Sequence, residues 1–266
     1  MNRNISLLLV MILMVACSKV PLTGRKQTTW MSSGEMQSMS YTNYKTVLNE
    51  AKKLPDSDPR VQQVKKVGAK IKLAVEAFMK QIKQEKLVEG FAWEFNVIDD
   101  PNMVNAWCMP GGKVAFYTGI LPICEDDLGV AVVMGHEVAH AIAKHGNERM
   151  THSLMQQMGG MALSVALTEK PEATKNLFMS AYGLGSNVGV MLPFSRTHES
   201  EADRLGLIFM AMAGYNPEAA PKFWGRMAKL SGGSQPPEFL STHPAHENRI
   251  KDLNANMVEA KKYFKP

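Results

Sequence analysis

The sequence has little of several features that mark common protein classes. It holds only three cysteines in 266 residues, so a structural zinc site, which is normally closed by four protein ligands and often by cysteines, is not favoured. The formal net charge is a modest +5, and no stripe of lysine and arginine with interleaved aromatic residues is visible, which argues against a nucleic-acid partner. No internal repeat is found. With 45% hydrophobic and 21% charged residues, the composition is that of a globular protein with a substantial core.

The hydrophobic run at the N-terminus, Ile5 to Ala16, is too short to span a bilayer comfortably and has the length of a signal-peptide core. It ends in a small residue before Cys17, which resembles the bacterial lipobox whose cysteine becomes lipidated. Met14 stands where leucine is usual in that motif. The pattern predicts a lipoprotein signal peptide over residues 1–16 and a lipid anchor on Cys17; the alternative is an incidental cysteine after an ordinary signal peptide.

The residues after the anchor extend this prediction. Ser18 is not the aspartate that retains enterobacterial lipoproteins at the inner membrane, so we expect an outer-membrane anchor facing the bacterial periplasm. Residues 17–34, rich in serine, threonine and glycine, are predicted to form an extended tether. Residues 35–266 are predicted to form a single domain. Cys108 and Cys124 either form a disulfide or stay buried thiols, because sequence spacing does not show whether their Cα atoms approach.

Periodicity predicts an α+β domain that is predominantly helical, with a small antiparallel sheet or hairpin. Apolar residues recur at three- and four-residue steps after Asp58, a predicted helix N-cap. Residues 91–99 alternate as in a strand, and 105–121 predict a hairpin that turns at Gly111 and Gly112. Further helices are expected over residues 35–53, 128–145, 196–213, 217–230 and 246–263.

The helix expected at 128–145 carries the sequence His-Glu-Val-Ala-His. His136 and His140 are four residues apart, so both imidazoles can reach one metal ion from the same helix face. Glu137, the next residue along the helix, is expected to lie near the ion without binding it, where it can take a proton from a bound water. The short flanking residues are apolar, as a buried active-site helix requires. The alternative is a chance pattern on a helix surface.

A catalytic zinc site needs a third protein ligand. No histidine follows His140 at metzincin spacing, and His145 is turned roughly 140° away by helix geometry, which predicts a surface residue or an outer partner of the site. Glu199 and Asp203 are four apart on a later helix. Glu199 can complete a His2Glu site, and Asp203 can accept a hydrogen bond from a ligand histidine. Alternatively this helix is simply charged and faces solvent, as is expected for Glu201 and Arg204.

Several ordered motifs resemble a known family. They are HEVAH at 136–140, ESEADRLG at 199–206, STHPAHENR at 241–249, NAWCMPGGKVAFYTGIL at 105–121 and PLTGRKQ at 21–27. Together they resemble the gluzincin metallopeptidase family of HtpX, the CAAX prenyl endopeptidase and BepA, and most closely its compact LoiP-like lipoprotein proteases. The resemblance implies a zincin-type fold, one Zn²⁺ per chain and Glu199 as the third zinc ligand. It places His243 near the metal, where it stabilises the oxyanion or binds zinc in a self-inhibited state; a purely structural turn is the alternative. His152, His198 and His246 are expected at the surface.

These residues predict a zinc-dependent endopeptidase with Glu137 as the catalytic base. An extended substrate is expected to add as a strand to the hairpin at 113–118, which makes Asn105, Gly111, Gly112 and Lys113 candidates for substrate contact. Such backbone recognition suits misfolded or unassembled envelope proteins. The alternative is a chaperone-like lipoprotein that binds unfolded outer-membrane proteins with little cleavage, although binding alone needs no general base.

Overall fold

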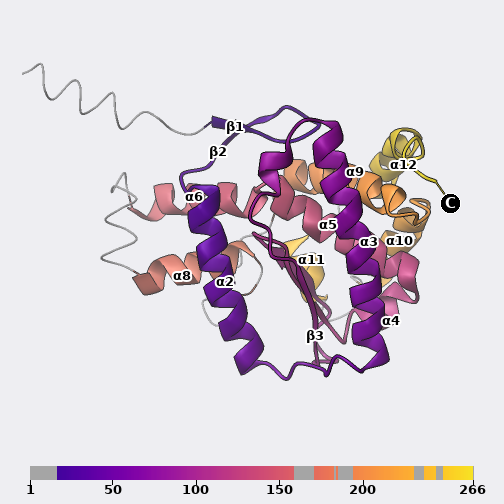
Figure 1. Cartoon of the computed structure of the whole chain (residues 1–266), viewed down its shortest axis with the longest axis horizontal. Helices are drawn as coiled ribbons and strands as arrows, with labels where there is room; N and C mark the ends of the chain where they lie inside the picture. The colour runs from indigo at the N-terminus through magenta and orange to yellow at the C-terminus, as the bar shows by residue number, and fades with distance from the viewer. Residues whose placement is uncertain are drawn as a thin grey trace, which may run out of the picture.

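The computed structural model describes residues 17–158, 171–182, 184, 194–230, 237–243 and 248–265. This part confirms the predicted α+β fold, in which helices surround a small sheet (Figure 1). The helices are α2 (Ser33–Glu50), α3 (Pro59–Gln81), η1 (Glu85–Leu87), α4 (Leu121–Cys124), α5 (Asp127–Ile142), α6 (His145–Met158), α8 (Pro171–Ala181), α9 (Arg196–Met212), α10 (Ala219–Leu230), α11 (Glu238–Thr242) and α12 (Arg249–Ala260). The strands are β1 (Cys17–Lys19), β2 (Lys26–Thr28), β3 (Glu94–Ile98), β4 (Ala106–Met109) and β5 (Lys113–Tyr117). No helix in these ranges has the length and apolar character to cross a bilayer.

The predicted hairpin is formed by β4 and β5. Gly111 and Gly112 take φ of +83° and +77° at its turn, a region open to glycine but rarely to other residues. A Cβ on Gly112 would lie 2.6 Å from the Trp93 ring, so this turn also needs the small side chain. The sheet differs from the prediction, however, because it is mixed. Its order is β3–β5–β4, with β3 parallel and β4 antiparallel to β5.

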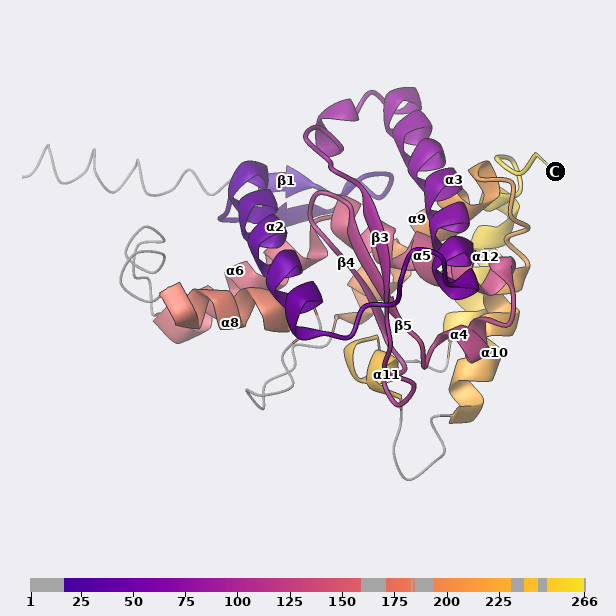
Figure 2. The same cartoon turned by 60° about the horizontal axis from the view of Figure 1, so that its bottom comes forward.

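The sheet lies between two layers of helices, with α2 on one side and α3 and α5 on the other (Figure 2). Alternate strand residues therefore face different partners. One set packs with α3 and α5, and comprises Val97, Ala106, Cys108, Val114 and Phe116. The other set packs with α2, and comprises Ile98, Trp107, Met109 and Ala115. Strand β5 takes the central position, where its backbone groups are paired with β3 on one edge and with β4 on the other.

Helix α3 forms as the sequence predicts. The Asp58 side chain accepts a hydrogen bond from the backbone N–H of Arg60 at 2.9 Å, and Pro59 occupies the first helical position, where its missing N–H costs nothing. Six of the seven predicted apolar positions are buried, namely Val61, Val64, Val67, Ile71, Val75 and Phe78. The seventh, Ile82, is half-buried just after the helix ends. The periodicity therefore identified the face that packs against the sheet.

The segment predicted as an extended tether is instead folded onto the domain. Strands β1 and β2 pair antiparallel, and the backbone N–H of Val20 donates to the carbonyl of Arg25 at 2.9 Å across the turn. Val20 is buried. Helix α2 then begins at Ser33, two residues earlier than expected, because Ser32 and Glu35 form a reciprocal capping box. We refer to residues 17–28 as the N-terminal hairpin.

Helices α5 and α9 pack closely at two glycines. A Cβ on Gly206 would lie 2.9 Å from the backbone N of His136, and one on Gly135 would lie 2.9 Å from the carbonyl oxygen of Gly206. Neither position has room for a side chain unless the two backbones separate. This contact brings the helix that carries Glu199 against the helix that carries His136.

Candidate functional site

The two histidines of the His-Glu-Val-Ala-His sequence meet as their spacing predicts. Asp126 caps helix α5 by accepting hydrogen bonds from Leu128 N–H at 2.8 Å and Gly129 N–H at 3.0 Å, where negative charge also suits the helix dipole. One turn apart on this helix, the Nε2 atoms of His136 and His140 lie 3.1 Å from each other. Both side chains are buried, so this is an interior site.

Glu199 and His243 complete a cluster of four donors. Glu199 Oε1 lies 3.3 Å from His140 Nε2, and its Oε2 lies 3.5 Å from His136 Nε2. His243 Nδ1 lies 3.1 Å from Glu199 Oε1 and 3.2 Å from His136 Nε2. Tetrahedral zinc with bonds of about 2.0–2.2 Å sets its donors roughly 3.3 Å apart. The four donors all lie within 4.8 Å of one another, so the cluster is suited to a zinc ion.

The charges in the cluster fit the same ion. Burial lowers the pKa of His140 well below its usual range, so the imidazole is neutral, the form that binds metal. Burial alone would raise the pKa of Glu199, but the nearby His243 and Arg249 outweigh it and hold that pKa well below its usual range. Glu199 is therefore a carboxylate.

Glu137 lies beside the cluster without joining it. Its Oε1 is 3.4 Å from His243 Nε2, and burial raises the pKa of its carboxyl group. A buried carboxylate of raised pKa next to a zinc site has the properties of a general base.

The fold and the site agree with a known peptidase family. The sequence profile described as peptidase family M48 matches residues 65–257. The chain belongs to this family. This M48 peptidase is a zinc metalloendopeptidase, as the motifs predicted.

Similar proteins come from mitochondria and from bacteria. Mitochondrial metalloendopeptidase OMA1 of Saccharomyces cerevisiae is 31% identical over 255 residues, which cover 92% of this chain and 70% of that protein. Metalloendopeptidase OMA1, mitochondrial, of Homo sapiens is 30% identical over 91% of this chain and 46% of its own length. A putative beta-barrel assembly-enhancing protease of Vibrio cholerae is 34% identical over 59% of this chain and 33% of its own length. The M48 peptidase thus spans less than half of the human relative.

The predicted location, a lipoprotein of the bacterial outer membrane facing the periplasm, is wrong on this comparison. Relatives that align with about nine-tenths of the chain are named as mitochondrial enzymes. A short apolar run followed by a cysteine does not identify one particular membrane. Residues 1–16, on which the signal-peptide prediction rested, lie outside the described residues, and lipid attachment at Cys17 stays a prediction.

The hydrogen bond predicted for Asp203 is present, and an arginine supports it. His136 Nδ1 lies 2.9 Å from Asp203 Oδ1. The buried Arg249 donates from Nε and Nη2 to Asp203 at 2.9 and 2.8 Å, and its Nη1 lies 2.8 Å from Glu199 Oε2. Arg249 is the last residue of the motif STHPAHENR, and no role was predicted for it. Its side chain reaches both acidic residues from the start of α12.

Three residues expected at or near the surface lie inside the M48 peptidase. Helix α5 ends at Ile142, and Lys144 takes a φ of +59°, so the chain turns back and buries His145 completely. His145 Nδ1 lies 2.9 Å from His140 Nδ1, which confirms it as an outer partner of the site. Glu201 is buried 3.0 Å from His145 Nε2, and His198 stacks on the His145 ring at 4.4 Å. The surface predictions for Glu201 and His198 are therefore wrong; His152 is exposed, and His246 lies outside the described residues.

The predicted substrate strand needs a correction, because β5 is central and has no free edge. Lys113 is buried and paired with Glu94, while Gly111 and Gly112 form the turn against aromatic rings. Strand β4 is the edge nearest the cluster. It lines a cavity of about 10 Å³ together with residues from the metal cluster and its surroundings, namely Asn105, Glu137, His140, Phe194 and His243. Of the four candidates, only Asn105 lines this cavity beside the metal cluster, and its side chain is buried.

The other two cysteines do not form the disulfide that oxidising conditions would allow. Cys108 and Cys124 are both free and buried. Cys108 packs within β4, and Cys124 ends α4. Burial raises the pKa of both thiols, so they stay protonated and serve as apolar core residues.

Replacing Gly206 with alanine is expected to weaken zinc binding by moving α9 away from α5. The new Cβ would lie 2.9 Å from backbone atoms that cannot rotate away, and such overpacking commonly costs about 1–3 kcal/mol. Gly225→Ala is the matched control, because nothing lies within 4 Å of a Cβ there, and alanine favours the helix. Competition with a zinc-binding dye and thermal unfolding measure the two effects. Equal zinc affinity in the two variants would show that the glycine contact does not set the ligand spacing.

Proposed function

We propose that this M48 peptidase cleaves internal peptide bonds in extended segments of misfolded or unassembled proteins. His136, His140 and Glu199 would hold the zinc ion, and Glu137 would transfer the proton. The convergence of three ligands from two helices, with a buried carboxylate beside them, carries this proposal. The polypeptide substrate and membrane association through a lipid on Cys17 belong to the same proposal.

The chain supplies proton transfer and orientation around the metal. A zinc ion in this site supplies an activated water and polarises the scissile carbonyl. Glu137 takes the proton of the attacking water and passes it to the leaving amine nitrogen, a role for which a raised pKa is suited. Asp203 holds His136 by its Nδ1 at 2.9 Å, so that Nε2 points into the cluster.

An extended substrate is best placed along the outer edge of β4. Among the described strands, β4 pairs only with β5, so no described strand covers its other edge. Because all four residues of β4 are buried, a substrate would add there only when the closed site opens. Asn105 at the start of β4 and Glu137 line the same cavity. Backbone pairing tolerates varied side chains, which suits an enzyme that acts on unfolded segments rather than on one sequence.

The structure has the geometry of a closed site. His243, itself one of the four donors, lies between the other three and Glu137. Its Nδ1 lies 3.2 Å from His136 Nε2, and its Nε2 lies 3.4 Å from the Glu137 carboxylate. The adjoining cavity of about 10 Å³ is at the lower limit for a single water molecule. We therefore favour His243 as a fourth, inhibitory ligand over a donor to the oxyanion, since a catalytic zinc keeps one position open.

His243→Ala is expected to raise cleavage of casein. The minor state of a two-state protein is commonly populated at about 0.1–10%, so removing the closed state would increase the rate about tenfold or more. Initial rates at saturating zinc measure this. A fall of about 10²-fold or more would instead identify His243 as a donor to the oxyanion.

The proposed activity is tested with unfolded and folded proteins side by side. Zinc-loaded protein and the His243→Ala variant are incubated with casein and with a stably folded control, and mass spectrometry locates the cuts. We expect internal cleavage of casein that a chelator abolishes and zinc restores. An absence of cleavage by both proteins at full zinc occupancy would contradict the proposal.

The alternative of a chaperone-like binding protein has one observation in its favour. The closed cavity leaves no room for a peptide beside the ligands, as expected of a protein that seldom cuts. Binding alone gives no reason for Glu137 to be buried beside the cluster, and the endopeptidase is therefore the better supported function.

A further inference from the structure

His140, the second histidine of the metal cluster, is held by a series of hydrogen bonds that extends beyond helix α5. His140 Nε2 faces the cluster, while its Nδ1 lies 2.9 Å from His145 Nδ1. An imidazole that binds metal through Nε2 carries its proton on Nδ1. His140 Nδ1–H therefore donates to His145 Nδ1, and His145 Nε2–H donates to Glu201 Oε2 at 3.0 Å. Asp203 thus contacts His136 directly, whereas Glu201 reaches His140 only through the imidazole of His145.

The N-terminal hairpin holds this carboxylate in place. Arg25 donates to Glu201 from Nε at 3.0 and 3.1 Å and from Nη2 at 3.0 Å. Thr23 Oγ1 donates to the same carboxylate at 2.7 Å. Arg25 also makes two bonds of 2.8 and 2.7 Å to Glu148 on α6, which accepts a further bond from His198 Nε2 at 2.9 Å. One guanidinium therefore joins α6 and α9 behind the metal cluster.

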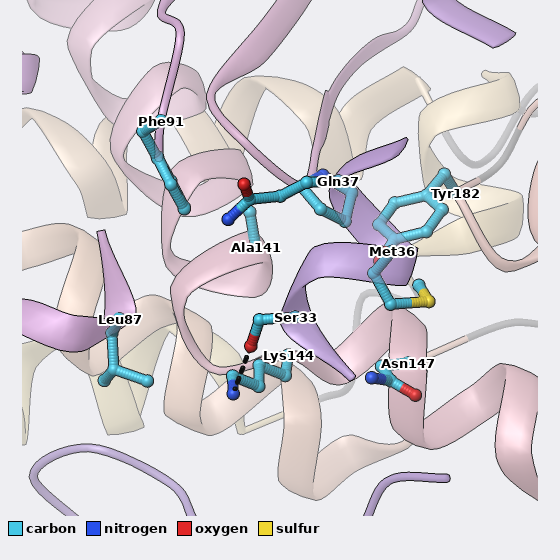
Figure 3. A pocket seen from close by; sticks show the side chains of 10 residues that line it. Ser33, Met36, Gln37, Leu87, Phe91, Ala141, Lys144, Asn147 and Tyr182 are labelled. Atoms are coloured by element: carbon cyan, nitrogen blue, oxygen red, sulfur yellow. Dashed lines mark hydrogen bonds between the residues drawn. The ribbon is translucent and has the colours of Figure 1, made fainter. Parts of the chain in front are cut away.

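The residues that follow the hairpin fasten it along α6 and its preceding turn. The backbone N–H of Trp30 donates to Thr151 Oγ1 at 3.0 Å, and Asn147 Nδ2 donates to the carbonyl of Met31 at 2.8 Å. Lys144 Nζ donates to Ser33 Oγ at 2.9 Å beside a small cavity at the start of α2 (Figure 3). These contacts hold the segment after the N-terminal hairpin against α6 and its preceding turn, and so fix the position of Arg25.

We propose that Arg25 is a positioning residue of the metal centre, acting through Glu201 and His145 on His140. The proposal rests on the zinc ligands named above. If Arg25 served only to dock the hairpin, its partner Glu201 would not need to be connected to a metal ligand through the fully buried His145. Because arginine satisfies both carboxylates with its planar fork, it fixes the direction of the Glu201 carboxylate as well as its charge.

The test measures zinc affinity and the absorption spectrum of the cobalt-substituted protein. Partners of a ligand histidine commonly change metal affinity by about 10–100-fold, so Arg25→Gln and Glu201→Gln are each expected to weaken zinc binding about tenfold or more. Both should shift the cobalt spectrum, since the direction of His140 changes. Arg25→Lys should restore only part of the affinity. Arg204→Gln is the matched control, because Arg204 on α9 makes a partly exposed ion pair with Glu259 on α12.

The outcomes separate this proposal from the proposed function. Zinc affinity and cobalt spectra equal to those of the parent protein in both glutamine variants would overturn the role of Arg25. Glu201→Gln keeps the shape of the side chain and leaves Arg25 paired with Glu148. Its zinc affinity and cobalt spectrum therefore test the proposal even if Arg25→Gln does not fold. If His140→Ala binds zinc as tightly as the parent protein, the ligand assignment itself is wrong, whatever Arg25 does.

Discussion

Replacing Glu137 with glutamine is expected to lower peptide-bond cleavage by about 10²- to 10⁴-fold without changing zinc content. Glutamine keeps the size of the side chain but cannot accept the proton of the attacking water. Glu137 lies beside His243 rather than among the donors that converge on the ion, so the metal site should stay intact. The effect is therefore on chemistry and not on assembly of the site.

Casein cleavage and metal content are measured together on the same samples. Glu259→Gln provides the matched control, because it makes the same chemical change in a partly exposed ion pair with Arg204, and we expect normal activity from it. Equal cleavage by Glu137→Gln and the parent protein at equal zinc content would show that Glu137 is not the base. The experiment is best repeated in the His243→Ala background, where the expected higher rate widens the measurable range.

The same experiment decides between an endopeptidase and a binding protein. An endopeptidase loses cleavage in Glu137→Gln but keeps its affinity for unfolded protein, because the amide can still contact a bound chain. A chaperone-like protein binds unfolded protein equally well with either residue and cuts with neither. Measuring the affinity for unfolded casein beside the cleavage rate therefore separates the two functions.

The part of the site that sequence could predict depends on local geometry. Positions four apart on a helix share a face whatever surrounds them, which placed His136 with His140 and Glu199 with Asp203. Helix spacing does not show that these two pairs meet at one site; the resemblance to the metallopeptidase family implied it. The hairpin at 105–121 was predictable for a similar reason, since two adjacent glycines mark a turn.

The rest depends on contacts between distant segments. A helix that continues past Ile142 predicts His145 off the ligand face, whereas the left-handed turn at Lys144 returns His145 to His140. Glu201 looked like a solvent-facing residue because its partner, Arg25, lies 176 residues away. The central position of β5 likewise follows from pairing with β3, which no pattern within either strand reveals.

Replacing Arg249 with methionine is expected to lower the free energy of unfolding of the zinc-free protein by about 3–5 kcal/mol, the usual loss when one partner of a buried ion pair is removed. The guanidinium contacts both Asp203 and Glu199 and stacks 3.2 Å over the Trp224 ring. Methionine can fill much of this space, but it leaves two buried carboxylates without their cation. Denaturant unfolding of the metal-free protein measures the loss, and Arg204→Met, which breaks a partly exposed pair, should cost only about 0–1 kcal/mol.

Zinc is expected to restore part of the stability that Arg249→Met removes. A bound cation next to Glu199 replaces one of the two ion-pair contacts that the arginine supplied, whereas Asp203 stays dependent on its contact with His136. The destabilisation should therefore be smaller in zinc-loaded protein than in zinc-free protein. An equal loss in both forms would mean that Glu199 gains nothing from the ion, and it would remove Glu199 from the ligand set. Arg249 would then stabilise two carboxylates that have only a structural role.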